Sequence, residues 1–200
     1  IILKAARLFD GKNKGASIQL IKNLPPASGI GGGSSNAAVT LKTLSRLWQK
    51  EMPNPDKILN LGADVPVCLS DQLQRMQGIG DCVTALVEPS PIWIVLVNPR
   101  VGISTSNIFR LLNSKENARL EPFLNCTDND GFFNYLSKQR NDLEDVTSKL
   151  FPEVKDTLEI ISNTPNCELC RMSGSGATCF GLYAKREYAE EAEKFIKESF

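Results

Sequence analysis

The segment Gly29–Asn36, with the sequence G-I-G-G-G-S-S-N, decides how the first half of the chain folds. Behind its four glycines, apolar residues recur at spacings of three and four, as they do along one face of an α-helix. The pattern predicts an amphipathic helix that begins directly after the glycines, with Ser34 or Ser35 capping its first turn. The apolar positions are Ala37, Ala38, Leu41, Leu44, Leu47 and Trp48.

Glycines ahead of a helix can serve an anion in two ways. Glycine adopts positive φ angles easily, and it carries no side chain that would keep an anion away from backbone N–H groups. The start of the helix adds unpaired N–H donors and a partial positive charge. The segment therefore predicts a phosphate-binding loop, and the alternative is a flexible linker or a structural turn.

Two common phosphate motifs do not fit this loop. A Walker A loop ends in Gly-Lys-Ser/Thr, whereas Gly33 is followed by two serines and no lysine. A dinucleotide-binding G-x-G-x-x-G that began at Gly29 would need a third glycine where Ser34 stands. The loop is therefore neither of these motifs.

Two further features are ambiguous when taken alone. The glycine cluster Ser173–Ala177 lies between two predicted strands, where a structural turn is the alternative to a binding loop. Asp64 lies in the bend Gly62–Pro66, and an aspartate in a bend is most often a turn or cap residue.

The composition excludes several classes of protein. The chain has 200 residues, 42% of them hydrophobic, and its 23 Lys and Arg balance its 23 Asp and Glu. With no net charge, binding to nucleic acid or to an anionic membrane has no electrostatic support. The longest apolar run, Ile92–Val97, is too short to cross a bilayer, and the first seven residues do not resemble a signal peptide.

Histidine and cysteine usage narrows the chemistry. The chain has no histidine, which excludes Ser-His and Cys-His nucleophile pairs and His-ligated metals within these residues. Its six cysteines are scattered, so we expect them to be reduced thiols of a cytoplasmic protein. Cys167 and Cys170 have the spacing of a metal or redox motif, but without a second such pair we interpret them as structural thiols.

Turn residues and apolar spacing outline the remaining elements and indicate an α+β fold with two domains, 1–88 and 89–200. The segment 89–91 is the predicted boundary, and Ile92–Val97 is expected to be a strand buried on both faces. Strands are further predicted at 17–21, 67–69, 170–172 and 177–183, a surface loop at 113–131, and helices at 57–61, 104–111, 142–150, 153–162 and 187–200.

Several segments together resemble the GHMP kinases (galactokinase, homoserine, mevalonate and phosphomevalonate kinases). Pro25–Asn36 is similar to the glycine loop of that family, and Met172–Thr178 is similar to its second glycine turn. Five strings in order resemble the branch of the family that phosphorylates 4-diphosphocytidyl-2-C-methyl-D-erythritol. These strings are Gly31–Ala38, Leu61–Pro66, Gly78–Gly80, Asn98–Pro99 with Ser104–Thr105, and Asn141–Glu144.

The resemblance implies a fold, a reaction and roles for residues. The fold would be that of the GHMP kinases, with a ribosomal S5 domain 2-like N-terminal part and a ferredoxin-like C-terminal part. The reaction would move the γ-phosphate of ATP to the 2-hydroxyl of the substrate, with Asp64 as the catalytic residue. Mg²⁺ would bridge the phosphates, with the hydroxyl of Ser34 or Ser35 as a direct or water-mediated contact. The implied ATP-binding residues are Pro25, Pro26, Ala27, Ser28, Gly29, Ile30, Gly31, Gly32, Gly33, Ser34 and Ser35.

The chain also departs from the family pattern. The first family motif, a strand that carries a lysine, has no counterpart before Pro25, so we expect the natural protein to contain residues that precede this sequence. Two alternatives remain open from the sequence. One is another GHMP kinase that acts on a different small alcohol, and the other is a nucleotide-binding protein without catalysis.

Overall fold

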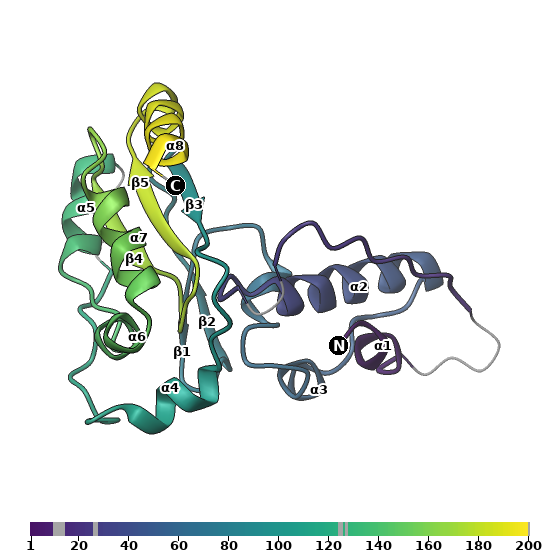
Figure 1. Ribbon diagram of the computed structural model, residues 1–200. Helices are drawn as coiled ribbons and strands as arrows, with labels where there is room; N and C mark the ends of the chain where they lie inside the picture. Colours follow the sequence, from purple (N-terminus) through teal and green to yellow (C-terminus); the bar gives the residue numbers. More distant parts are fainter. Residues whose placement is uncertain (10–14, 26–27, 124–125, 127, 200) are drawn as a thin grey trace. The chain divides into compact units, whose positions relative to one another are not determined.

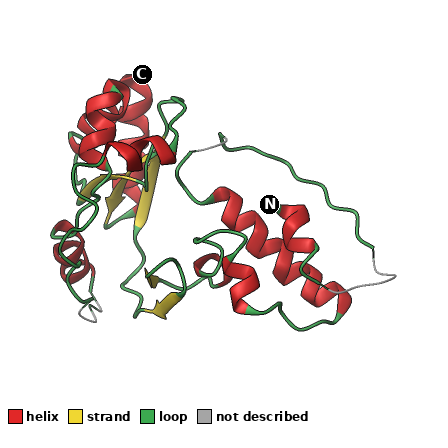
Figure 2. Cartoon of the chain, turned by 90° about the horizontal axis from the view of Figure 1, so that it is seen from below, coloured by secondary structure: helices red, strands yellow, loops and turns green. Residues whose placement is uncertain are grey.

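The computed structural model describes residues 1–9, 15–25, 28–123, 126 and 128–199. The chain divides into two compact units: residues 1–23 with 31–86, and residues 24–30 with 87–200. Helices and antiparallel strands are mixed along the chain, as Figures 1 and 2 show. This arrangement confirms the α+β class expected from the sequence.

The first unit is organised around helix α2 (Gly32–Trp48), which confirms the helix predicted behind the glycines. Helix α1 (Ile2–Ala6) packs against α2, and α3 (Pro55–Leu59) and the 3₁₀ turn η1 (Val67–Leu69) complete the unit on this side. The helices share one apolar core, which removes the inward face of α2 from water. Its buried members are Ala5, Phe9, Ala37, Ala38, Leu41, Leu44, Ile58 and Val65.

A short hairpin completes the first unit. Strands β1 (Gln74–Gln77) and β2 (Cys82–Ala85) pair antiparallel, with Gln77 opposite Cys82. Gly78 and Gly80 in the turn have φ angles of 66° and 96°, a region that glycine reaches without strain. No hairpin was expected here, because neither strand shows the alternation of apolar and polar residues that would predict one.

The second unit is built on a three-stranded antiparallel sheet in the order β3-β5-β4 (Figure 1). The strands are β3 (Trp93–Val97), β4 (Leu169–Met172) and β5 (Cys179–Tyr183). Helix α7 (Pro152–Ser162) packs against β4 and β5, and α8 (Arg186–Ser199) packs against β3 and β5. The remaining helices of the unit are α4 (Thr105–Leu111), α5 (Asn129–Ser137) and α6 (Glu144–Leu150).

Three sequence predictions about strands are wrong. Residues 17–21 belong to neither of the two sheets in the described part of the chain and do not form a strand there. Residues 67–69 form the turn η1 instead of a strand. Strand β3 is not buried on both faces: it lies at an edge of its sheet, and Ile94 and Leu96 are 53% and 51% exposed. Helix α5 was not predicted, although its buried Phe132 and Phe133 show why it packs.

Among the residues that the structure describes, none of the helices combines the length and the apolar character needed to cross a membrane.

Candidate active site

Helix α2 starts at the glycine loop without help from a side chain. Gly31 is the N-cap and adopts the left-handed conformation, with φ 66° and ψ 15°, and its carbonyl accepts the Ser35 N–H at 2.9 Å. The prediction that Ser34 or Ser35 caps the helix is therefore wrong, because both serines lie inside the first turn. With Gly31 as the N-cap, the helix begins three residues earlier than a cap at Ser34 would place it.

The backbone at this helix start is open to a ligand. A Cβ added to Gly31, Gly32 or Gly33 would meet no atom within 4 Å. The first N–H groups of an α-helix have no partner inside the helix, and here no side chain caps them and no acidic residue stands in the first turn. Free donors, empty space and the positive end of the helix fit an anion such as a phosphate group.

The loop that carries Asp64 lies beside this helix start. A Cβ on Gly62 would lie 3.8 Å from the Ser34 Oγ, so the two segments are in contact range. Val65, three residues after Gly62, is fully buried in the core that includes α2, and it holds the loop in place. Asp64 itself is exposed. The structure thus brings the predicted catalytic residue and the glycine loop from Gly31 onward into one unit.

The cysteine Cys68 lies close to Asp64 and is affected by its charge. Cys68 lies in η1, and its backbone N–H donates to the Asp64 carbonyl at 3.3 Å. Burial raises the pKa of the Cys68 thiol, and the nearby Asp64 carboxylate raises this pKa further.

The preceding part of the loop belongs to the second unit, where it contacts the other glycine turn. The Ser173 Oγ donates to the Gly29 carbonyl at 2.9 Å, and the Thr178 N–H donates to the Ser28 carbonyl at 3.2 Å. Gly29 has φ 76°, and a Cβ there would lie 2.4 Å from the Gly176 carbonyl oxygen. Within the second unit, Ser28 and Gly29 of the glycine loop therefore pack directly on the turn Ser173–Thr178.

The other predicted loop residues are less informative. Ile30 is half-buried in the second unit, and Pro25 is exposed. Pro26 and Ala27 lie outside the described residues.

The turn Ser173–Gly176 is held by side chains to which sequence reasoning gave no role. The Asn141 Nδ2 donates to the carbonyls of Met172 and Gly174, at 3.0 Å and 2.8 Å. The Glu144 Oε2 accepts the Met172 N–H at 2.7 Å. In the sequence, the string Asn141–Glu144 stood out only through its resemblance to the family. Its polar side chains at the start of a predicted helix were the signal that could have indicated hydrogen bonds to a neighbouring turn.

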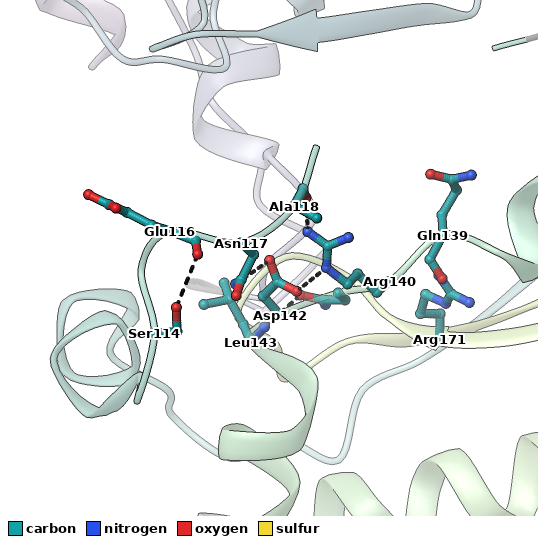
Figure 3. A network of polar contacts seen from close by, with 10 residues as sticks. Ser114, Glu116, Asn117, Ala118, Gln139, Arg140, Asp142, Leu143 and Arg171 are labelled. Carbon is teal, nitrogen blue, oxygen red and sulfur yellow. Dashed lines mark hydrogen bonds and ion pairs between the residues drawn. The ribbon is translucent and has the colours of Figure 1, made fainter. Parts of the chain in front are cut away.

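A cavity of about 500 Å³ adjoins this turn in the second unit. Its wall includes the aromatic ring of Phe109, the cations Lys115 and Arg140, and the segment Met172–Gly174. Beside it lies the polar network of Figure 3, in which Asp142 accepts from the Arg140 Nε at 2.7 Å and from the Asn117 Nδ2 at 2.9 Å. The sequence did not predict this cavity, because its lining comes from segments far apart along the chain.

Two other kinds of site, a metal cluster and a reactive thiol, can be compared with this one. Within the described ranges, no group of three or more His, Cys, Asp or Glu side chains is placed to hold a metal ion. All six cysteines lie in the described part of the chain and are free thiols. Burial raises the pKa of Cys170 and Cys179 to about 12, which makes these two thiols poor nucleophiles.

Comparison with known proteins assigns the chain to a family. Residues 1–87 match the model of the GHMP kinases N terminal domain, and residues 122–200 match that of the GHMP kinases C terminal domain. A 4-diphosphocytidyl-2-C-methyl-D-erythritol kinase of Cereibacter sphaeroides (strain ATCC 17029) is 45% identical over 198 residues, which is 98% of this chain and 70% of the relative. The protein of the same name from Paramagnetospirillum magneticum is 43% identical and matches 96% of this chain and 70% of its own length.

Solved structures agree with the sequence relatives. A crystal structure of 4-(cytidine 5'-diphospho)-2C-methyl-D-erythritol kinase superposes with a TM-score of 0.71 at 27% identity and covers 88% of this chain and 65% of its own. A homoserine kinase from Cytophaga hutchinsonii superposes with a TM-score of 0.67 at 18% identity, covers 90% of this chain and 64% of its own, and supports the fold alone. Confirming the resemblance expected from the sequence, the chain belongs to the GHMP kinases, in the family of 4-diphosphocytidyl-2-C-methyl-D-erythritol kinases.

Proposed function

We propose that this chain is a small-molecule kinase that transfers the γ-phosphate of ATP to the 2-hydroxyl of 4-diphosphocytidyl-2-C-methyl-D-erythritol. The observation that carries the proposal is the open helix start at Gly31–Ser35 with the Asp64 loop beside Ser34. This pairing gives phosphoryl transfer the two parts it needs, an anion site and a carboxylate. The name and the 45% identity of the Cereibacter sphaeroides relative support the choice of substrate.

The ATP site in this proposal comprises the residues predicted from the sequence, 25–35. The backbone N–H groups at the start of α2 bind the phosphates, because they are unpaired and point out of the positive end of the helix. Ser28 and Gly29 contribute through their contacts with the turn Ser173–Gly176. The absence of acidic residues in the first turn of α2 supports this role, since a carboxylate there would repel the nucleotide.

Asp64 is the catalytic base in the proposal. Phosphoryl transfer passes through a loose transition state, so the chain mainly positions the reactants and stabilises charge, while the base accepts the proton of the attacking hydroxyl. The exposure of Asp64, in a loop anchored by the buried Val65, supports this role, because a base must reach its substrate from a fixed backbone.

We include Mg²⁺ in the proposal as the partner of the ATP phosphates. Mg²⁺ is commonly held by one or two protein oxygens together with phosphate oxygens, so a site at the glycine loop would not need a cluster of carboxylates. The hydroxyl of Ser34 or Ser35 is the protein oxygen that the proposal assigns to the ion, directly or through water. When bound, the ion neutralises charge on the phosphates.

The remaining parts of the proposal concern organisation and location. We place the domains at 1–88 and 89–200, and we expect a cytoplasmic protein that binds neither nucleic acid nor membrane. The six free thiols support this location, since structural disulfides belong to oxidising compartments. The balanced charge, 23 basic against 23 acidic residues, supports the lack of polyanionic partners.

The substitution Asp64→Asn in the complete enzyme tests the proposal. We expect kcat to fall by about 10²–10⁴, the usual contribution of a positioned base, while ATP affinity stays unchanged. Asp56→Asn is the matched control, because Asp56 is an exposed carboxylate of the same unit, and its kcat should equal that of the wild type. Unchanged kcat in Asp64→Asn would remove Asp64 from the mechanism.

A second measurement tests the acceptor. ADP release is measured with 4-diphosphocytidyl-2-C-methyl-D-erythritol, with homoserine and with mevalonate. The proposal requires the cytidyl compound to have the highest kcat/KM of the three. Turnover of another alcohol with equal or higher kcat/KM would overturn the substrate, and ATP binding without any turnover would overturn the kinase itself.

A further inference from the structure

The turn of the β1–β2 hairpin lies directly against the loop that carries Asp64. Gly80 is buried in this turn and has a φ of 96°. A Cβ on Gly80 would lie 2.1 Å from the carbonyl oxygen of Ala63 and 2.8 Å from its carbonyl carbon. Both atoms belong to the peptide that joins Ala63 to Asp64. Because they are backbone atoms, they cannot rotate away as the end of a side chain could.

The opposite side of the Asp64 loop is fixed. Val65 is fully buried in the core of the first unit, and its N–H donates to the Gly62 carbonyl at 3.0 Å. The Cys68 N–H donates to the Asp64 carbonyl at 3.3 Å, which ties the loop to η1. A shift of the Ala63 peptide toward the core is therefore opposed, and any displacement of this peptide is passed on to the exposed Asp64 that follows it.

We propose that Gly80 is a positioning residue, which sets the place of the Asp64 carboxylate through direct contact with the Ala63 peptide. The inference rests on the proposed function, in which Asp64 is the base. Real Cβ atoms keep at least 3.0 Å from such neighbours, so a side chain at position 80 must widen the 2.1 Å approach to 3.0 Å or more. A displacement of about 1 Å at a catalytic group can lower the rate by roughly 100-fold.

Gly78 provides a matched control within the same turn. It also has a positive φ, 66°, but a Cβ there would meet only the carboxylate of Asp81, at 2.2 Å from Oδ1. That carboxylate accepts the Ile79 N–H at 3.0 Å and belongs to the hairpin itself. Substitution of Gly78 therefore imposes the same kind of positive-φ strain on the turn, but its steric overlap falls on a side-chain end that can rotate away and not on the Asp64 loop.

The experiment measures kcat and the KM for ATP of Gly80→Ala and Gly78→Ala in the complete enzyme, with circular dichroism to confirm folding. We expect kcat of Gly80→Ala to fall by about 10- to 100-fold, with the KM for ATP within about two-fold of wild type, because the glycine loop is untouched. Gly78→Ala should keep kcat within about two-fold of wild type. Equal losses of kcat in the two variants, or no loss in Gly80→Ala, would overturn the inference.

A double variant separates positioning from general damage. In the Asp64→Asn background the base is already lost, so adding Gly80→Ala should lower kcat no further. A full additional loss would mean that Gly80 acts through something other than Asp64. If Asp64→Asn alone keeps full activity, the proposed function fails; if Asp64→Asn is inactive while Gly80→Ala is normal, only the present inference fails.

Ala63→Gly keeps the inference testable should Gly80→Ala not fold. This change adds no atom. It increases the backbone freedom of the peptide between residues 63 and 64, which Gly80 contacts. We expect kcat to fall by about two- to five-fold through the added backbone freedom, again with no effect in the Asp64→Asn background. Wild-type kcat in Ala63→Gly would contradict the importance of this contact.

Discussion

Replacement of Gly32 by valine should separate nucleotide binding from folding stability. Gly32 is exposed at the first position of α2, its φ is not in the left-handed region, and a Cβ there would meet nothing within 4 Å. The folded chain can therefore hold a valine at this position without strain. Valine and glycine differ by only a few tenths of a kcal/mol in helix propensity, so we expect the free energy of unfolding to change by less than about 0.5 kcal/mol.

The effect on ATP follows from the hydrogen bonds at stake. Valine adds three carbon atoms to the open space at this helix start, where the proposal puts the phosphates. A hydrogen bond to a charged group contributes about 1.5–3 kcal/mol, and 1.4 kcal/mol corresponds to a factor of ten in affinity. Loss of one such bond should raise the Kd for ATP by about 10- to 100-fold.

The assay combines titration calorimetry with a non-hydrolysable ATP analogue and thermal unfolding without ligand. Gly15→Val is the control, because Gly15 is also exposed with nothing within 4 Å of an added Cβ, but it lies outside the loop. Its Kd should equal that of the wild type. Wild-type affinity in Gly32→Val, with intact folding, would refute the placement of the phosphates at this helix start.

Three further predictions concern stability, and urea unfolding measures each. Asn141→Leu should lower the free energy of unfolding by about 2 kcal/mol, since the Met172 and Gly174 carbonyls lose their donor; an unchanged value would contradict this role. Gly29→Ala should cost at least about 1–2 kcal/mol, because of its φ of 76° and the 2.4 Å approach to Gly176, and wild-type stability would contradict it. Burial raises the pKa of Cys170 and Cys179 from 9.0 to about 12, so the unfolded chain loses these protons first. Stability should be constant below about pH 9 and fall toward pH 12, and a flat profile there would exclude this effect.

The parts of the fold that could be predicted from the sequence depend on local pattern. Helix α2 was predictable because the three- and four-residue spacing of Ala37 to Trp48 depends on no other part of the chain. The N-cap of α2 was not predictable, because the choice between a serine and a left-handed Gly31 depends on the path of the preceding loop. The hairpin β1–β2 was missed because its strands have no apolar alternation, and the two glycines of its turn were the signal available.

The candidate site divides in the same way. The glycine loop and Asp64 were found from motif and resemblance, and their catalytic roles remain predictions. The support for the second turn could not be found, since Asn141 contacts carbonyls 31 and 33 residues further along the chain. Such pairings form only when the segment ahead of α6 folds against the turn that follows β4, which no short window of sequence contains.

The thiol of Cys82 gives the hairpin a practical use. It is the first residue of β2 and the exposed one among the six cysteines of the described chain. A maleimide fluorophore would therefore label this position well before the half-buried or buried thiols. Emission from that dye would let an observer follow, in real time, how the turn around Gly80 responds when nucleotide is added.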